Sequence, residues 1–164
     1  GIVSAIALPS YRTFVLNARM TAQANEFLAM LSFTRSEAIK RNTRVTMCKS
    51  ADPNAATPAC TTAGTWAQGW IVFADAGTAA DATGDTILRV HPALDGSSTM
   101  IGNTNVASYI SYISNGQARM ASGFGQNGTV KLCSPDSTIV GRDIVLSPFT
   151  GRARVDNPPL VACS

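Results

Sequence analysis

One uninterrupted stretch of helix-forming sequence constrains this chain more than any other feature. After Pro9, neither glycine nor proline occurs again until Pro53. Apolar residues within the stretch recur at steps of three and four, which places them on one face of an α-helix: Met20, Ala24, Phe27, Leu28, Leu31 and Ala38. The opposite face carries polar and charged residues: Arg12, Arg19, Asn25, Ser32 and Lys40. The pattern predicts one amphipathic helix from residue 9 to about residue 42, with Pro9 in its first turn.

After residue 43 the apolar spacing changes from three or four residues to two. Short runs rich in β-branched and aromatic residues predict strands near residues 45–47, 70–73, 86–90, 109–113, 129–133 and 139–146. Their connections are too short for crossover helices, so we expect a mostly antiparallel sheet. The compositions of residues 51–65 and 74–85 indicate loops. The 164 residues therefore predict a single α+β domain in which a helix in residues 1–42 packs on a β-rich part, residues 43–164.

The chain begins with a short apolar run, residues 1–8, which only Ser4 interrupts. It is far shorter than the roughly 20 residues of a bilayer-spanning helix. The run is either the start of a short apolar helix or the remainder of a longer hydrophobic one. Because the first residue is Gly and not Met, we expect a processed or truncated chain.

The net charge of +3 hides an uneven distribution. Residues 1–50 hold seven Lys and Arg against two Glu, which gives +5. Residues 51–100 hold one Arg against five Asp, which gives −4, and residues 101–164 hold five Lys and Arg against three Asp, which gives +2. Two basic regions that flank an acidic one can bind a polyanion, or they can be two solvated faces of an ordinary surface.

The four cysteines favour disulfides over a metal site. Cys48, Cys60, Cys133 and Cys163 form no Cys-x-x-Cys pair, and the single histidine, His91, is distant from them in sequence. A zinc site needs clustered thiolates or imidazoles. We expect the pairs Cys48–Cys60 and Cys133–Cys163, each of which closes a loop within one region, although four buried free thiols are the alternative. Disulfides would indicate a periplasmic or extracellular location.

The sequence offers little support for catalysis or for cofactor binding. A Ser-His-Asp mechanism would need His91, which follows a strand run and precedes Pro92, a position typical of a structural role at a sheet edge. Residues 123–128 match Gly-x-Gly-x-x-Gly, but the residues that follow predict a strand in place of the helix that a dinucleotide site requires. The dipeptide Asn127-Gly128 instead predicts a hairpin turn. We therefore expect no enzyme, no catalytic residue and no cofactor.

The segment Thr-Gly-Arg-Ala-Arg-Val near the carboxyl terminus carries two arginines at alternate positions. An extended backbone would place Arg152 and Arg154 on the same side, about 7 Å apart, a spacing similar to that of adjacent DNA phosphates. Gly151 would let a DNA backbone pass close by, and the Cys133–Cys163 bond would hold the tail in place. The alternative is a solvated edge strand whose arginines discourage aggregation.

Together these motifs resemble the type IV pilins and pseudopilins of the GspH/FimT family, and most of all its FimT-like members. The resemblance covers almost the whole chain. It rests on Ala7-Leu-Pro-Ser-Tyr11, Thr34-Arg35-Ser36-Glu37-Ala38, Val45-Thr-Met-Cys48, Phe124-x-x-x-Gly128, Val130-x-Leu-Cys133 and Gly151-Arg-Ala-Arg154.

The resemblance implies a long helix on an antiparallel sheet, in a precursor cleaved after a glycine and methylated on an amino-terminal Phe. The cleavage site, that Phe and a glutamate five residues in are not in this sequence, so we expect the membrane part of the helix to be absent. The family further implies other pilins as partners through the helix, and membrane contact only through the missing segment. It implies an inner-membrane location before assembly and then a place at or near the pilus tip, with the globular part periplasmic or extracellular.

Three functions follow from the same resemblance. FimT-like members bind DNA for uptake in natural transformation through a Gly-Arg-x-Arg segment, which matches Gly151, Arg152 and Arg154, with Arg142 or Lys131 as additional contacts. Because the tail offers no recognition helix and no stacking aromatic, we expect weak phosphate binding without base readout. FimU-like members prime pilus assembly and GspH-like members belong to type II secretion pseudopili, and neither role requires DNA.

Overall fold

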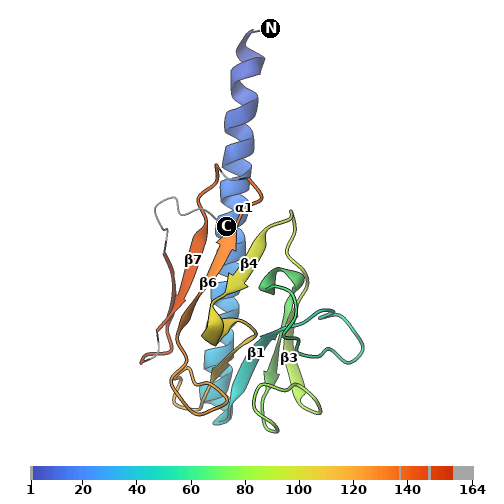
Figure 1. Cartoon of the computed structure of the whole chain (residues 1–164), viewed down its shortest axis with the longest axis vertical. Coiled ribbons are helices and arrows are strands. Elements are labelled where there is room, and N and C mark those ends of the chain that lie inside the picture. The colour runs from blue at the N-terminus through green and yellow to red at the C-terminus, as the bar shows by residue number, and fades with distance from the viewer. Residues whose placement is uncertain (1, 137, 148, 157–164) are drawn as a thin grey trace.

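The fold consists of one long helix that lies along two antiparallel β-sheets (Figure 1). The computed structural model describes residues 2–136, 138–147 and 149–156, with side chains from residue 11 onward. The elements in chain order are α1 (Ile2–Arg41), β1 (Val45–Lys49), η1 (Trp66–Gln68), β2 (Trp70–Ala74), β3 (Thr86–His91), β4 (Thr99–Gly102), η2 (Thr104–Val106), β5 (Tyr109–Tyr112), β6 (Gly128–Cys133), β7 (Arg142–Leu146) and β8 (Ala153–Asp156).

Helix α1 extends further toward the amino terminus than the sequence predicts. It begins at Ile2, so Pro9 lies inside the helix and not in its first turn. Proline removes one backbone hydrogen bond, and the helix-forming residues on both sides carry α1 through this position. The helix ends at Arg41, close to the predicted end, because Asn42 adopts a left-handed conformation with φ of 53° and terminates the last turn.

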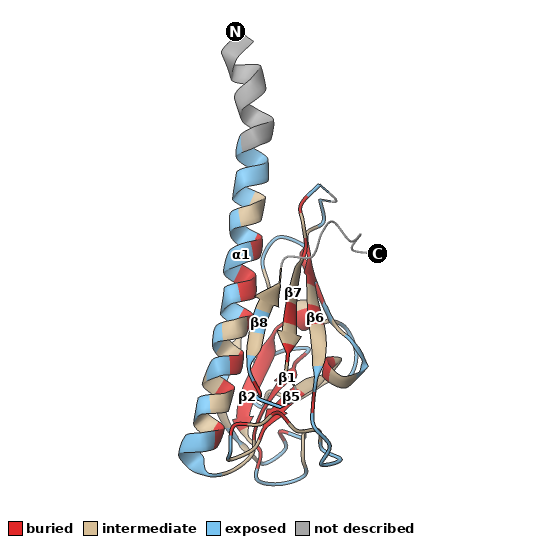
Figure 2. Ribbon diagram, turned by 90° about the vertical axis from the view of Figure 1, so that its left-hand side faces the viewer, coloured by how far each residue is buried: buried red, intermediate tan, exposed pale blue. Residues whose placement is uncertain are grey.

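One stripe of α1 is buried, and it is the stripe that the sequence predicts. The buried residues of this stripe are Met20, Ala24, Phe27, Leu31 and Ala38, while Leu28 is half-buried. The amino-terminal part of α1 projects beyond the sheets (Figure 1), whereas the buried residues of α1 are on the side that faces the sheets (Figure 2). The apolar side chains of Tyr11, Phe14 and Val15 are exposed. Among the described residues, no helix has both the length and the apolar character needed to cross a bilayer.

The strands form two four-stranded sheets and not the one sheet expected. The first has the order β3-β2-β1-β5, the second has the order β4-β6-β7-β8, and all pairs are antiparallel, as predicted. All six predicted runs contain strands. Two further strands, β4 and β8, have four residues each and are too short for their alternation to stand out, although an extended backbone was expected around Arg152 and Arg154. Periodicity identifies strands but not their partners, so the division into two sheets is not visible in the sequence.

The hairpin turn predicted at Asn127-Gly128 is wrong. Gly128 is the first residue of β6, and the turn in this region lies at residues 120–123. The buried side chain of Gln126 accounts for the difference, because its amide accepts a hydrogen bond from a backbone N–H of β5 and donates to two nearby carbonyl groups. These bonds hold the segment extended against β5, and tertiary contacts thus override the local turn preference.

The main core is centred on the aromatic ring of Phe27. This ring packs edge-to-face on Trp66 and on Trp70, with both pairs of ring centroids 5.2 Å apart, and all three residues are fully buried. Trp70 is also stacked on His91, with centroids 4.0 Å apart. The single histidine therefore lies at the end of edge strand β3 in a packing role, as its sequence position indicates.

A disulfide joins the buried strand β1 to the loop that follows it. It links Cys48 and Cys60, whose Cα atoms are 5.6 Å apart, and it is the first of the two bonds expected from the sequence. The second expected bond, Cys133–Cys163, falls partly outside the described residues, since Cys163 belongs to the segment 157–164.

Replacing Phe27 with Ala should lower the free energy of unfolding by about 3–5 kcal/mol, because it opens a cavity between two buried tryptophans. Urea unfolding followed by tryptophan fluorescence measures this loss. Phe14→Ala is the matched control, since Phe14 lies on the same helix but is 71% exposed, and it should change the free energy by less than about 0.5 kcal/mol. Similar losses for the two variants would contradict the central role of Phe27.

Candidate nucleic-acid interface

The predicted arginine pair lies on a hairpin formed by β7 and β8. Backbone hydrogen bonds close the connection between these strands, because Ser147 N–H donates to the Arg152 carbonyl at 2.9 Å and Gly151 N–H donates to the Ser147 carbonyl at 3.1 Å. Strand β8 then pairs with β7 along its whole length and forms one edge of the second sheet. The backbone that carries the arginines is thus fixed by the sheet.

Side chains alternate along this segment as the sequence predicts for an extended chain. Ala153 and Val155 are partly buried against the main core. Arg152 and Arg154 are exposed on the intervening positions. The hairpin therefore presents both guanidinium groups to solvent.

Gly151 is required by the protein's own backbone. It has a φ of +62°, and a Cβ atom at this position would collide with the Gly116 carbonyl oxygen and lie 3.1 Å from the Ala118 nitrogen. The sequence argument assigned the missing side chain to the passage of a DNA backbone. In the structure residues 116–118 occupy that space, so the reason for this glycine is internal packing.

The two arginines of the hairpin differ in their partners. The Nε atom of Arg154 lies 3.0 and 3.2 Å from the two carboxylate oxygens of Asp156, and this hydrogen bonding raises the pKa of the Arg154 guanidinium above its usual value. The Arg154 side chain is 67% exposed, and an ion pair so open to water contributes little. Arg152 has no carboxylate partner within the described part of the chain.

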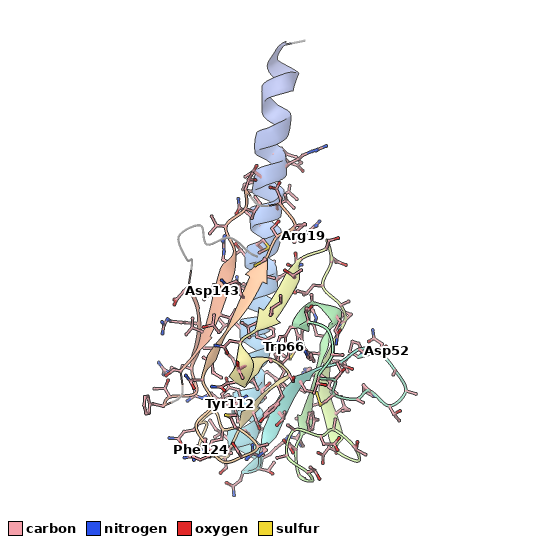
Figure 3. All side chains as sticks on the ribbon, in the orientation of Figure 1. Arg19, Asp52, Trp66, Tyr112, Phe124 and Asp143 are labelled. Atoms are coloured by element: carbon pink, nitrogen blue, oxygen red, sulfur yellow. A yellow bond between two sulfur atoms is a disulfide. The ribbon has the colours of Figure 1, made fainter. Side chains whose placement is uncertain are left out.

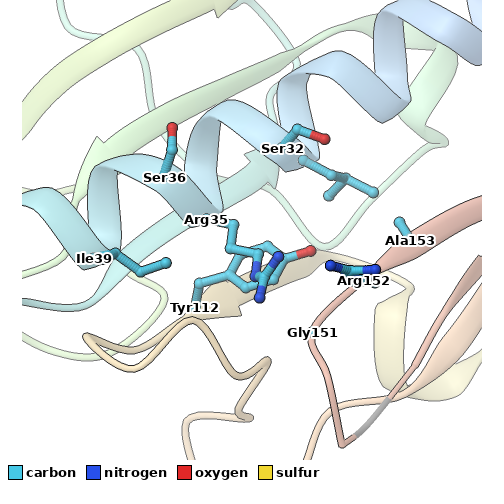
Figure 4. A pocket seen from close by; sticks show the side chains of 9 residues that line it. Ser32, Arg35, Ser36, Ile39, Tyr112, Gly151, Arg152 and Ala153 are labelled. Atoms are coloured by element: carbon cyan, nitrogen blue, oxygen red, sulfur yellow. The ribbon is translucent and has the colours of Figure 1, made fainter.

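Arg152 also lines a cavity between α1 and the start of β8 (Figure 4). The cavity has a volume of about 330 Å³, and its lining residues are Leu31, Ser32, Arg35, Ser36, Ile39, Tyr112, Gly151, Arg152 and Ala153. Arg35 Nε donates a hydrogen bond of 2.9 Å to the Gly116 carbonyl, the same group against which Gly151 packs. The Gly116 carbonyl thus accepts a hydrogen bond from Arg35 of α1 and also packs against Gly151 at the start of the arginine segment.

The register places Arg142 away from the hairpin arginines. Arg142 is opposite Leu132, whose side chain is buried, whereas Arg154 is opposite Val145 on the other face of the sheet. The Arg142 guanidinium donates to the Val140 carbonyl at 2.8 Å. It therefore adds no cation to the surface formed by Arg152 and Arg154.

Lys131 shares a sheet face with Arg154, but it lies two strands away and Asp143 of β7 is its direct neighbour. The row of paired residues that begins at Lys131 continues to Asp143 and then to Asp156. Figure 3 labels Asp143, the middle member of this row. The outer face of the second sheet therefore carries charges of both signs and does not form a basic surface. Of the five positions considered from the sequence, the structure groups Gly151 and Arg152 with Arg154 only.

An exposed aromatic residue in the hairpin was missed in the sequence analysis. Phe149 lies in the connection between β7 and β8, and it is 84% exposed. The statement that the tail has no aromatic available for stacking is therefore wrong. The sequence could have indicated its exposure, because Phe149 stands among turn-forming residues between two strand segments. An aromatic side chain in such a tight connection rarely reaches the core.

Replacing Gly151 with Ala should lower the free energy of unfolding by about 1–3 kcal/mol, because it combines a strained φ with a collision against the Gly116 carbonyl. Urea unfolding checks this against two glycine controls. Gly123→Ala introduces strain alone, since Gly123 has a φ of +89° and no neighbour within 4 Å, and it should lose less. Gly77→Ala introduces neither effect. A loss at Gly151 no larger than that at Gly123 would contradict the close-packing argument.

Comparisons with known proteins agree with this architecture. The family model described as type II transport protein GspH matches residues 23–151. Two crystal forms of the type IV minor pilin FimU from Pseudomonas aeruginosa strain PAO1 share the fold. The first has a TM-score of 0.62 and 21% identity, and the match covers 90% of this chain and 93% of FimU. The second has a TM-score of 0.58 and 19% identity over 85% of this chain and 93% of FimU.

No protein with a curated description matches the sequence. Because their identities are near 20%, the FimU structures support the fold only. Membership of a family rests on the match to the GspH model. That match includes α1 from Gln23 onward and strands β1 to β7, and it ends at Gly151, before Arg152 and β8. The chain therefore belongs to the GspH family and is a minor pilin or pseudopilin of the GspH/FimT kind.

Proposed function

We propose that this pilin binds DNA without sequence preference through the β7–β8 hairpin, for DNA uptake in natural transformation. The observation that carries the proposal is the exposed Arg152 and Arg154 pair on a backbone that the sheet already fixes. Because the hairpin is ordered before DNA arrives, little conformational entropy remains to be lost on binding. Arg152 directly precedes β8 and Arg154 lies within it, and two alternate positions of an extended backbone, about 7 Å apart along it, fit two neighbouring phosphates.

The binding should depend strongly on salt. Each neutralised phosphate of duplex DNA contributes about −0.9 to the slope of log K against log salt, so two contacts predict a slope of about −1.8. Arg154 must exchange Asp156 for a phosphate, and the exposure of this ion pair makes that exchange easy. Arg152 has no such competitor among the described residues, so we expect it to be the stronger contact.

Phe149 extends the proposal from duplex to single-stranded DNA. An exposed ring beside two cations is the arrangement with which proteins hold single strands, because bases stack on the ring while the backbone follows the charges. Phe149 is exposed in the same connection that leads to Arg152. We therefore expect the hairpin to favour single strands over duplexes.

The second candidate function is that of a structural subunit in a pilus or secretion pseudopilus, FimU-like or GspH-like. It is favoured by the exposed apolar side chains of Tyr11, Phe14 and Val15 on the projecting part of α1. Neighbouring apolar side chains in water are typical of a contact surface. In this proposal other pilins cover them, and the subunit passes from the inner membrane to a place at or near the tip. Family membership itself associates the chain with the cell envelope.

The double variant Arg152→Gln/Arg154→Gln should weaken binding to a short duplex by at least about tenfold, since it removes two charge-assisted phosphate contacts. Fluorescence anisotropy at low salt measures the affinity, and a salt series should show a slope closer to zero for the variant. Arg12→Gln/Arg19→Gln is the matched control, because it removes two exposed arginines from α1, and it should bind as the unmodified protein does. Equal losses in both variants, or no loss in the first, would overturn the assignment.

Phe149→Ala should weaken binding to single-stranded DNA by about tenfold and leave duplex binding nearly unchanged, because stacking on one ring contributes about 1–3 kcal/mol per base. The comparison uses single strands and duplexes of the same length in the same anisotropy assay. Phe14→Ala removes an equally exposed ring from α1 and should alter neither affinity. A parallel loss for both forms of DNA would argue against stacking.

A further inference from the structure

The cavity between α1 and the start of β8 contains two cations and no described carboxylate. Arg35 enters from the helix and Arg152 from the hairpin, and no acidic side chain is among the described residues that line it. Two guanidinium groups that share a small cavity repel each other unless an anion lies between them. The composition of this cavity therefore suits an anionic group.

Arg35 is held in position by one of its nitrogens. Its Nε atom donates to the Gly116 carbonyl, and its terminal Nη atoms make no hydrogen bond to any described residue. The Glu37 carboxylate, two positions along the helix, is already bonded to Arg41 at 2.7 Å and is not part of the cavity lining. The Gly116 carbonyl thus orients the Arg35 guanidinium, and its Nη atoms remain free to donate to a ligand.

Tyr112 contributes a third donor group. The residue is 1% exposed and lines the cavity, yet its hydroxyl makes no hydrogen bond within the described part of the chain. Burial raises the pKa of Tyr112 well above its usual value, although nearby Arg35 acts in the opposite direction, so the hydroxyl keeps its proton at neutral pH. Because Tyr112 lines the cavity, a ligand oxygen there would accept a hydrogen bond from its hydroxyl.

Figure 4 shows these three side chains together, Arg35 and Tyr112 beneath α1 and Arg152 reaching toward them from the segment after Gly151. The side chains of Ser32 and Ser36, which complete the helix side, are exposed, so the cavity opens to solvent. Its volume of about 330 Å³ is at the lower end of the range for ligand sites and suits one group of a larger ligand.

We infer that this cavity binds one phosphate group of the DNA backbone, with Arg35 and Arg152 on either side of it and the Tyr112 hydroxyl as a third donor. The inference rests on the proposed DNA binding and adds Arg35 and Tyr112 to that interface. A phosphate is favoured over a carboxylate because its oxygens point in several directions and can accept from two guanidinium forks and a hydroxyl at once. The same hairpin also carries Arg154, so a strand anchored in the cavity can continue along β8.

The first test measures duplex binding by anisotropy for single variants. Arg35→Gln should weaken binding by about tenfold, and Tyr112→Phe by about three- to tenfold, because it removes only one hydrogen-bond donor. Tyr112→Phe keeps the ring in the core and removes a hydroxyl that has no described partner, so its urea midpoint should stay unchanged. Arg19→Gln, a single charge removed elsewhere on α1, is the control and should not weaken binding. The double variant Arg35→Gln/Arg152→Gln should lose less than the sum of its parts, because both arginines hold the same phosphate.

The second test titrates inorganic phosphate while NMR follows the arginine Nε–H signals. Arg35 and Arg152 should shift with one common midpoint, and Arg152→Gln should abolish the shift of Arg35. If DNA binds but neither Arg35→Gln nor Tyr112→Phe weakens it, the inference is wrong and the hairpin function stands. If phosphate moves both signals but no DNA binds, the anion site stands and DNA is not its ligand. If neither phosphate nor DNA moves these signals, the cavity is not an anion site.

Discussion

The burial of one stripe of α1 against both sheets is the constraint on which the rest of this structure depends. No strand pair joins the two sheets in the described part of the chain, so side-chain packing holds them in place. The main core draws residues from α1, from β1 and β2 of the first sheet and from β6 and β7 of the second. Phe27 of α1 packs edge-to-face against two tryptophans in this core. Near the end of α1, Arg35 adds a polar link to the segment that supports the arginine hairpin.

Local sequence patterns predict the parts of this fold that depend on local structure. The buried stripe follows from helical spacing, and the six predicted runs contain strands because alternation persists over several residues. The division into two sheets and the strand β4 depend on partners chosen in three dimensions, which no spacing reveals. Gln126 illustrates the limit most clearly. The Gln126 side-chain amide makes hydrogen bonds to three backbone groups. These bonds hold the segment before β6 extended, although the Asn-Gly dipeptide favours a turn.

The same distinction applies to the candidate site. The alternation that exposes Arg152 and Arg154 is a local property and was predicted from the sequence. The importance of Gly151 was also predicted, but for a DNA contact, whereas its reason is the carbonyl of a segment distant in sequence. The strand register separates Lys131 and Arg142 from the hairpin arginines, because it places Asp143 between Lys131 and β8 and puts Arg142 on the face opposite Arg154. Neither fact can be obtained from the positions of charges along the chain.

The structure also shows how the basic residues of the amino-terminal third are used. Lys40 and Arg41 both lie within ion-pair distance of Glu37, so part of the positive charge at the end of α1 is compensated locally. Arg35 belongs to the same basic region, yet its guanidinium is turned into a cavity that it shares with the hairpin.

The two proposed surfaces therefore use different parts of one helix. Residues of the last turns of α1 line the cavity, whereas the exposed apolar residues lie in the projecting part near the other end (Figure 1). Other pilins that cover the projecting part do not need to cover the hairpin. The two proposed functions thus require different residues of the same subunit, so evidence for the first would not be evidence against the second.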